Sequence, residues 1–117
     1  MGNIETQSGD KTRRIRELND AMRAGACEVG TVVVTSGIHE KGVEFLASVS
    51  KAVAEFTAFT PDNDPYGEHD FGSVVLDGEK VFWKIDYYDL IMSAHSPDAS
   101  DPQVTNRVLT IMLAHEY

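Results

Sequence analysis

Hydrophobic side chains recur at helical spacing in three parts of the chain. Apolar residues three or four positions apart form one stripe over residues 12–24 and a longer one over residues 39–56, which is typical of helices packed on a core. A third stripe follows Asp101 and Pro102, a pair typical of a helix N-cap with proline at the first helical position. The spacing therefore predicts three helices, the last of which runs nearly to Tyr117.

A different pattern predicts strands between these helices. The run Thr31–Thr35 is β-branched throughout and shows no polar alternation, so we expect a strand that is buried on both faces or central in the sheet. Residues 72–88 predict a hairpin, because Asp77-Gly78 suits the positive φ angles of a type I′ turn. This turn fixes which apolar side chains share the core face: Val74, Val81, Trp83, Ile85 and Tyr87.

The order of these elements, α-β-α-β-β-α, predicts a single α+β domain over residues 12–117. A small sheet that contains antiparallel strands, with helices packed on it, is the simplest way to bury the apolar faces. The length of 117 residues and the hydrophobic content of 42% suit one such domain. Residues 1–11 are polar and show no periodicity, so we expect a disordered tail there.

The acidic residues are concentrated in the second half of the chain. The net charge is −9, and residues 61–117 contribute −8 of it, with eleven Asp or Glu against three Lys or Arg. A field of this sign repels nucleic acids and anionic membranes at neutral pH. The charge therefore predicts a protein partner with a basic surface and argues against direct nucleic-acid binding.

Composition also limits the compartment. No stretch approaches the roughly 20 apolar residues that a membrane helix needs, and residues 1–10 contain no hydrophobic signal region. The single cysteine, Cys27, allows no intramolecular disulfide, as is usual in reducing compartments. We therefore expect a cytoplasmic protein without a membrane segment.

The most unusual segment is the loop over residues 60–72, which gathers four carboxylates and a histidine among prolines and glycines. The candidates for a metal site are Asp62, His69 and Asp70, since hard cations prefer oxygen ligands. The spacing matches the start of a calcium loop, but Tyr66 and Ser73 stand where a third oxygen ligand and the closing glutamate belong. We favour turn chemistry with solvent-facing charges, so no metal or other cofactor is expected.

A second candidate lies on the strand that follows the hairpin turn. Lys84, Asp86 and Tyr88 share its non-core face and, with the loop carboxylates, faintly resemble the site of a metal-dependent nuclease. The acidic-x-lysine step of such sites is absent, because Phe82 precedes Lys84 by two residues. We favour a half-exposed face of paired charged and aromatic side chains.

Four segments carry a family resemblance. They read RIRELND at residues 14–20, FTPDNDPYGEHDFG at 59–72, FWKIDYYD at 82–89 and RVLTIMLA, followed by EY, at 107–117. Together they resemble a family of short, mainly alphaproteobacterial proteins catalogued as domain of unknown function 3768. That family carries no assigned activity or catalytic residues. Its members are similar to other small proteins found on plasmids and prophages, which implies a role in mobile-element biology.

These observations favour a non-enzymatic binding protein whose acidic half occupies a basic surface of a larger protein. An inhibitor of a host nucleic-acid-binding machine, similar to an anti-CRISPR protein, fits this size, charge and genomic company. The expected partner-binding residues are Asp62, Asp64, Tyr66, Glu68, His69, Asp70, Asp86 and Tyr88.

Two alternatives remain open. One is a small metal-dependent hydrolase acting on a phosphate-containing substrate. Its ligands or acid–base groups would be His69, Asp70, Asp62 and Asp86. The other is a homo-oligomeric module that uses the predicted last helix as its contact surface. The sequence sets neither the oligomeric state nor the identity of a partner.

Overall fold

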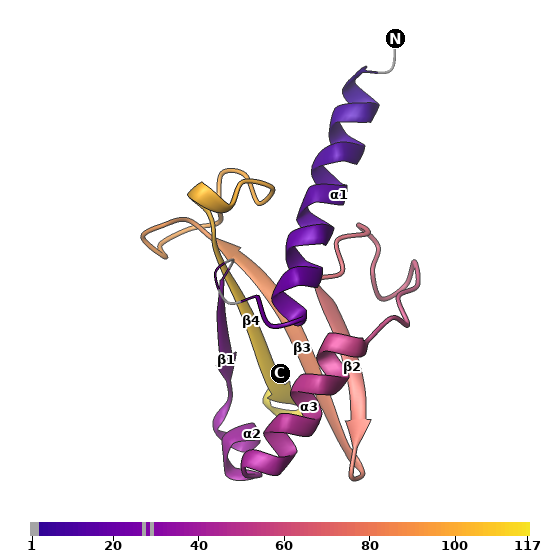
Figure 1. The fold of residues 1–117 in the computed structure, drawn as a ribbon, viewed down its shortest axis with the longest axis vertical. Coiled ribbons are helices and arrows are strands. Elements are labelled where there is room, and N and C mark those ends of the chain that lie inside the picture. The colour runs from indigo at the N-terminus through magenta and orange to yellow at the C-terminus, as the bar shows by residue number, and fades with distance from the viewer. Residues whose placement is uncertain (1–2, 27, 29) are drawn as a thin grey trace.

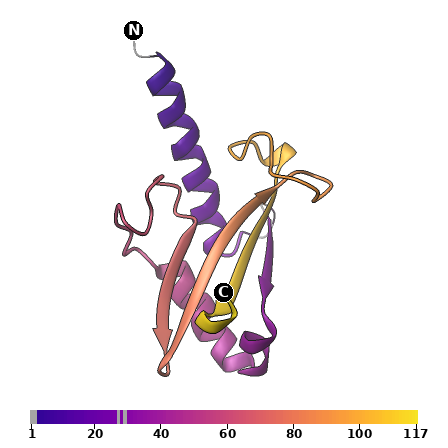
Figure 2. The ribbon, with the colours of Figure 1, turned by 180° about the vertical axis from the view of Figure 1, so that it is seen from behind.

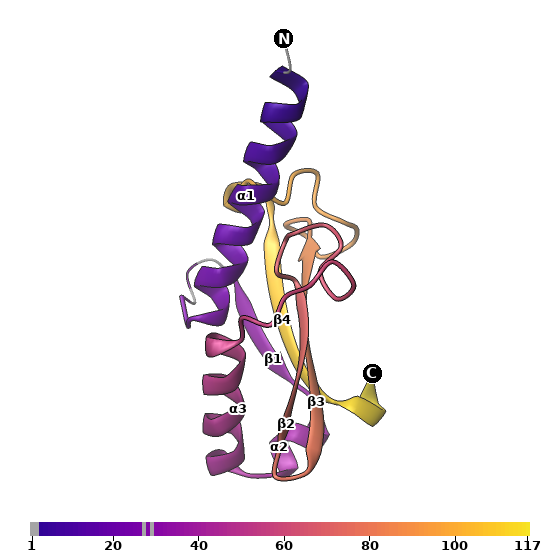
Figure 3. The ribbon, with the colours of Figure 1, turned by 90° about the vertical axis from the view of Figure 1, so that its right-hand side faces the viewer.

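Helices cover one face of the sheet. The computed structural model describes residues 3–26, 28 and 30–117, and in this part of the chain four strands form one sheet in the order β1-β4-β3-β2. Helices α1 and α3 lie against one face (Figure 3), and Figure 2 shows the strands of the opposite face in front of them. The elements are α1 (Asn3–Arg23), β1 (Thr31–Val34), α2 (Ser36–Glu40), α3 (Val43–Glu55), β2 (Phe71–Leu76), β3 (Glu79–Tyr88), β4 (Asn106–Leu113) and the 3₁₀ turns η2 (Pro102–Val104) and η3 (Ala114–Glu116).

The predicted α+β class is confirmed, although the order of elements differs from the predicted one. The helices and strands alternate as α-β-α-α-β-β-β rather than α-β-α-β-β-α. Within the described residues, every helix is too short or too polar to cross a membrane.

The first helix is longer than its apolar stripe predicts. We expected a tail over residues 1–11, whereas α1 begins at Asn3 and extends beyond the end of the sheet (Figure 1). Once the packed segment has nucleated a helix, each further residue costs little, because it adds one hydrogen bond for one fixed residue. Asp10 and Arg13, three positions apart, also pair at 3.2 Å on this extension.

The predicted central strand is an edge strand. β1 runs parallel to β4 on one side only, and the side chains of Val32 and Val33 are 45% and 44% exposed. The run of valines misled the prediction, because β-branched residues suit any extended segment, and burial depends on which neighbours the chain supplies.

The prediction of a last helix is wrong. Residues 106–113 form β4, which pairs with β1 on one side and with β3 on the other. Asp101 does cap a helical turn, accepting a hydrogen bond from the Gln103 amide at 2.9 Å, but this turn ends at Val104. The apolar residues that follow alternate between the two sheet faces, so Leu109 and Ile111 reach the core as a strand would place them. A contact surface built on a last helix therefore does not exist.

The hairpin prediction is confirmed. Asp77 and Gly78 have φ angles of 51° and 78°, and Val74 pairs with Val81 as the turn requires. The predicted long helix, in contrast, is divided into α2 and α3, with Gly42 at φ 98° between them.

The core lies between the sheet and the two longer helices. Trp83 of β3 is fully buried and has Phe56 and Phe59 edge-on at 5.7 and 6.2 Å. Gly72 lies on the facing strand, where a Cβ atom would come within 2.6 Å of the Trp83 ring. Packing in this core holds β3 in place, and the candidate site lies at the C-terminal end of β3.

Candidate functional site

A cavity of about 400 Å³ lies beside residues 85–88 of β3, which extend past the first residue of β2. β2 starts at Phe71. The residue before it, Asp70, still runs alongside β3, and its carbonyl accepts a hydrogen bond from the Ile85 amide at 2.8 Å. On the far side of the gap the chain folds back, and the Ser96 amide donates to the Tyr87 carbonyl at 3.0 Å. The lining residues are Asp70, Ile85, Asp86, Tyr87, Tyr88, Met92, Ser93, Ala94 and His95.

Two carboxylates give this cavity its acidic character. Burial raises the pKa of Asp70, and repulsion from Glu68 adds to the effect. Among the described residues, no Lys or Arg forms an ion pair with Asp70. Asp86 pairs with Lys84 at 2.9 Å, so the neighbouring wall carries a neutralised pair. The cavity therefore contains one half-buried carboxylate whose charge is left uncompensated.

Met92 contributes an exposed apolar side chain to the lining of the cavity. Met92 has a φ of 59° and is 51% exposed, and its neighbours Leu90 and Ile91 are also exposed. The loop that carries them is held by Asp89, whose carboxylate accepts hydrogen bonds from the amide and hydroxyl of Ser93 at 2.9 and 3.2 Å. These bonds lower the pKa of Asp89. A lining that combines two carboxylates with the apolar side chain of Met92 suits a ligand group that has an aliphatic stem and a cationic end.

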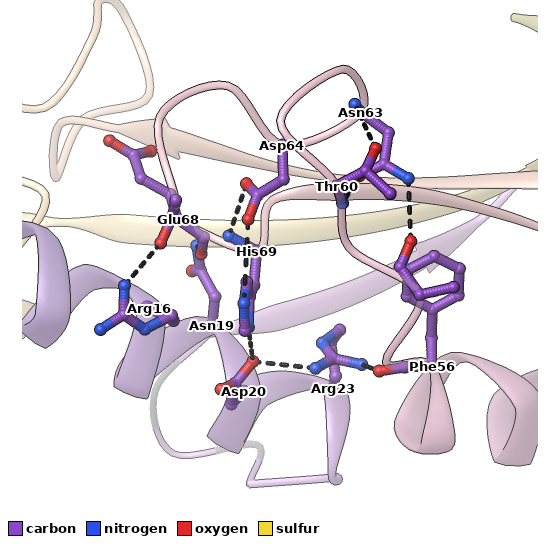
Figure 4. Close-up of polar contacts among 12 residues, drawn as sticks. Arg16, Asn19, Asp20, Arg23, Phe56, Thr60, Asn63, Asp64, Glu68 and His69 are labelled. Atoms are coloured by element: carbon purple, nitrogen blue, oxygen red, sulfur yellow. Dashed lines mark hydrogen bonds and ion pairs between the residues drawn. The ribbon is translucent and has the colours of Figure 1, made fainter.

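The loop between α3 and β2 is tied to α1 through His69, as Figure 4 shows. The His69 Nδ1 atom lies 2.9 Å from Asp20 Oδ1, and its ring stacks on Phe59 at 3.8 Å between centroids. Asp20 also accepts a hydrogen bond from Arg23 at 2.8 Å. Asp64 is buried and accepts the His69 amide at 3.0 Å, which helps to hold His69 at a φ of 56°.

A buried polar network lies beneath this loop. Asn19 donates to the Glu68 carbonyl at 2.9 Å and to the Tyr87 hydroxyl at 2.8 Å, and it accepts from Arg107 Nε at 2.7 Å. The Tyr87 hydroxyl donates in turn to Glu68 Oε1 at 2.8 Å. Burial is the main cause that raises the pKa of Tyr87 and lowers the pKa of Arg107. The network joins α1, the loop, β3 and β4.

The predicted site residues fall into three groups. Asp70, Asp86 and Tyr88 line the cavity together. The residues that hold the loop in place are Asp64, Glu68 and His69. The remaining two, Asp62 and Tyr66, are exposed on the outer part of the loop, with Tyr66 at 76%.

The residues that anchor the site were missed in the sequence. Asn19 and Arg23, four positions apart, interrupt the apolar face of α1, and Arg107 begins the inward-facing set of β4. A polar residue at a position that the periodicity assigns to the core is the signal that could have found all three. His95 was overlooked because only tertiary folding brings it to the cavity.

The metal candidates do not come together as a ligand set. Within residues 3–26, 28 and 30–117, no three His, Cys, Asp or Glu side chains lie close enough to hold a metal ion. Asp70 lines the cavity, whereas His69 contacts Asp20, and Asp62 is exposed.

The fold and site define a small α+β domain with an acidic cavity at one end of its sheet. The model of a family described as a protein of unknown function (DUF3768) matches residues 34–116, and the chain belongs to this family. No curated protein and no solved structure matches the chain. The matched range includes the whole cavity and ends just short of Tyr117, while α1, which anchors the loop, precedes it.

Proposed function

We propose that the chain is a non-enzymatic, cytoplasmic binding protein that receives a basic side chain of a protein partner in the cavity beside β3. The observation that carries the proposal is the uncompensated Asp70 carboxylate in a cavity that also contains Asp86 and Tyr88. A lysine or arginine of the partner would supply the missing positive charge. Its stem would contact Met92, and its head group would lie between the two carboxylates.

The net charge of −9 extends this preference beyond the cavity. A basic surface that normally contacts the phosphates of DNA or RNA has the complementary charge and would be steered toward the acidic end of the domain. The protein would then act as an inhibitor that competes with nucleic acid, which fits the mobile-element association of the family that it resembles. Tyr66, exposed on the loop, would contribute to the outer part of this surface.

The first experiment uses defined peptides. We would measure binding of a fluorescein-labelled arginine-rich peptide by fluorescence anisotropy, with a serine-substituted peptide as the reference. The double variant Asp70→Asn/Asp86→Asn should weaken binding by at least about tenfold, because it removes the two carboxylates that line the cavity. Asp62→Asn is the matched control, since it removes an exposed charge and should change affinity by less than about threefold.

The second experiment identifies the partner. The wild type, the double variant and Asp62→Asn serve as baits for capture from a lysate of the source organism, followed by mass spectrometry. A basic partner should be retained by the wild type and by Asp62→Asn, and lost with the double variant or at high salt. Equal binding by all three baits, or equal weakening by both substitutions in the peptide assay, contradicts a specific role of the cavity.

The hydrolase alternative stays a prediction that no particular contact favours. Its candidate ligands Asp62, His69 and Asp70 lie in three different surroundings: at the exposed surface, against Asp20 and in the lining of the cavity.

A further inference from the structure

The outer edge of β1 is an unguarded sheet edge. The Thr35 amide donates to the Ile111 carbonyl of β4 at 3.1 Å, so the amides and carbonyls two residues earlier, at Val33, face the same way. The amides and carbonyls of Val32 and Val34 therefore point away from the sheet. Figure 1 shows β1 at the margin of the molecule, with no other strand on its outer side.

Natural sheet edges are usually protected by charged side chains, proline or a bulge. β1 has none of these, and no Lys, Arg, Asp or Glu lies between Glu28 and Glu40, the longest such stretch in the sequence. Val32 and Val33 are nearly half exposed at this edge. Although the chain has a net charge of −9, a second copy can therefore approach this edge with little repulsion.

An apolar groove accompanies the same edge on the helix side of the sheet. It has a volume of about 120 Å³ and is lined by Val32 together with Met22, Val53, Leu109 and Ile111. An extended segment added to β1 would gain backbone hydrogen bonds along the edge and a partly apolar surface beside it, which are the two elements of strand addition.

We propose that two copies of this chain pair through β1 in an antiparallel arrangement around a twofold axis at Val33. The segment Thr31–Thr35 reads Thr-Val-Val-Val-Thr, a palindrome centred on Val33. Antiparallel self-pairing therefore places Val32 opposite Val34 of the second copy, and threonine opposite threonine at the ends. The residues whose backbone groups point outward, Val32 and Val34, become the hydrogen-bonded pairs.

The opposite edge of the sheet is a poorer candidate for the same contact. Antiparallel self-pairing of β2 about Ser73 would place Gly72 opposite Val74 and Phe71 opposite Val75, so it lacks matched β-branched pairs. The twofold arrangement at β1 joins the two sheets into one and places Val34 of the second copy beside the groove at Val32. The acidic cavity takes no part in this contact, so the proposal is independent of the proposed function.

The first test is the mass in solution, measured by sedimentation over a range of concentrations. The wild type should move from 12.9 kDa toward twice that mass as concentration rises. Val33→Lys places two like charges opposite each other on the axis and should raise the dimer dissociation constant by at least about tenfold. Val75→Lys, at an exposed position on β2, is the matched control and should dimerise as the wild type does.

The second test is site-specific crosslinking. In a Cys27→Ser background, Val33→Cys should form a disulfide-linked dimer under mild oxidation, because the Cα atoms of a non-hydrogen-bonded pair lie about 4.5 Å apart. Val75→Cys should crosslink at least about tenfold more slowly. A wild type that stays monomeric at all concentrations, or a Val75→Cys variant that crosslinks as fast as Val33→Cys, overturns the proposal.

Discussion

The cavity beside β3 and the free edge of β1 differ in how their polar groups are arranged. Beside the cavity, side chains from α1, the loop, β3 and β4 hydrogen-bond to one another in a buried network around Asn19. At β1, the unpaired groups belong to the backbone and are left at the surface. A site held by side chains depends on individual residues, whereas an edge depends on the register and on the absence of charge.

The largest effect should follow from breaking the network at the cavity. Asn19→Ala removes three hydrogen bonds. The buried Arg107 guanidinium would keep its hydrogen bond to the Ala99 carbonyl at 2.6 Å and its contact with the Tyr87 ring. We expect the free energy of unfolding to fall by about 3 kcal/mol, as measured by urea denaturation. Asn106→Ala, which removes bonds to the Asp89 and Leu90 carbonyls near the surface, should cost less than about 1 kcal/mol.

The next effect concerns the end of β1. The Glu116 carboxylate accepts hydrogen bonds from the Thr35 hydroxyl at 2.5 Å and from the amides of Gly37 and Leu113 at 2.9 Å, and these bonds lower its pKa. A lowered pKa in the folded state stabilises the protein above the unfolded pKa, and this contribution disappears as pH falls through the folded pKa. Glu116→Gln should therefore lower the melting temperature by roughly a few degrees at pH 7. The difference should vanish in acid, and a constant difference at all pH values would contradict the ionic role.

A smaller effect, of opposite sign, should follow at the cavity itself. The raised pKa of Asp70 means that its contribution to stability is present below the unfolded pKa and is lost as pH rises through the folded pKa. Asp70→Asn should thus raise the free energy of unfolding at pH 7, by less than about 1 kcal/mol because the group is partly exposed, while it weakens peptide binding.

Asp89→Asn is the matched control for the direction of this change in the free energy of unfolding. Its carboxylate has a lowered pKa because of the hydrogen bonds from Ser93, so its removal should destabilise the protein at pH 7. Circular dichroism during urea denaturation at pH 7 compares the two variants. Destabilisation by both substitutions would show that Asp70 is a structural carboxylate and not a binding group.

The smallest change in stability should come from the β1 edge. Val33→Lys alters a side chain that is 44% exposed, so the free energy of unfolding of the monomer should change by no more than about 0.5 kcal/mol. The same substitution should nevertheless shift the monomer–dimer equilibrium. A large loss of monomer stability would mean that Val33 is part of the core and that β1 is not a free edge.

The candidate site illustrates how far local sequence reasoning reaches. Asp70, Asp86 and Tyr88 were predicted and do meet at the cavity, because the loop leads directly into β2, which pairs with β3. Asp64 and His69 were expected at a binding surface. In the structure, Asp64 accepts a hydrogen bond from the His69 amide within the loop, and the His69 ring contacts Asp20 of α1. Asp20, the partner of the His69 ring, is 49 positions from His69, a separation that no spacing rule covers.

The sequence by itself determined the α+β class, the hairpin and its register, since turn chemistry at Asp77-Gly78 and strand alternation are local properties. The tertiary structure alone decided that β1 is an edge strand and that residues 106–113 form a strand between β1 and β3. The apolar residues of that segment satisfy a helical and an extended period equally well. Long-range pairing with two neighbouring strands supplies the hydrogen bonds that favour the extended form.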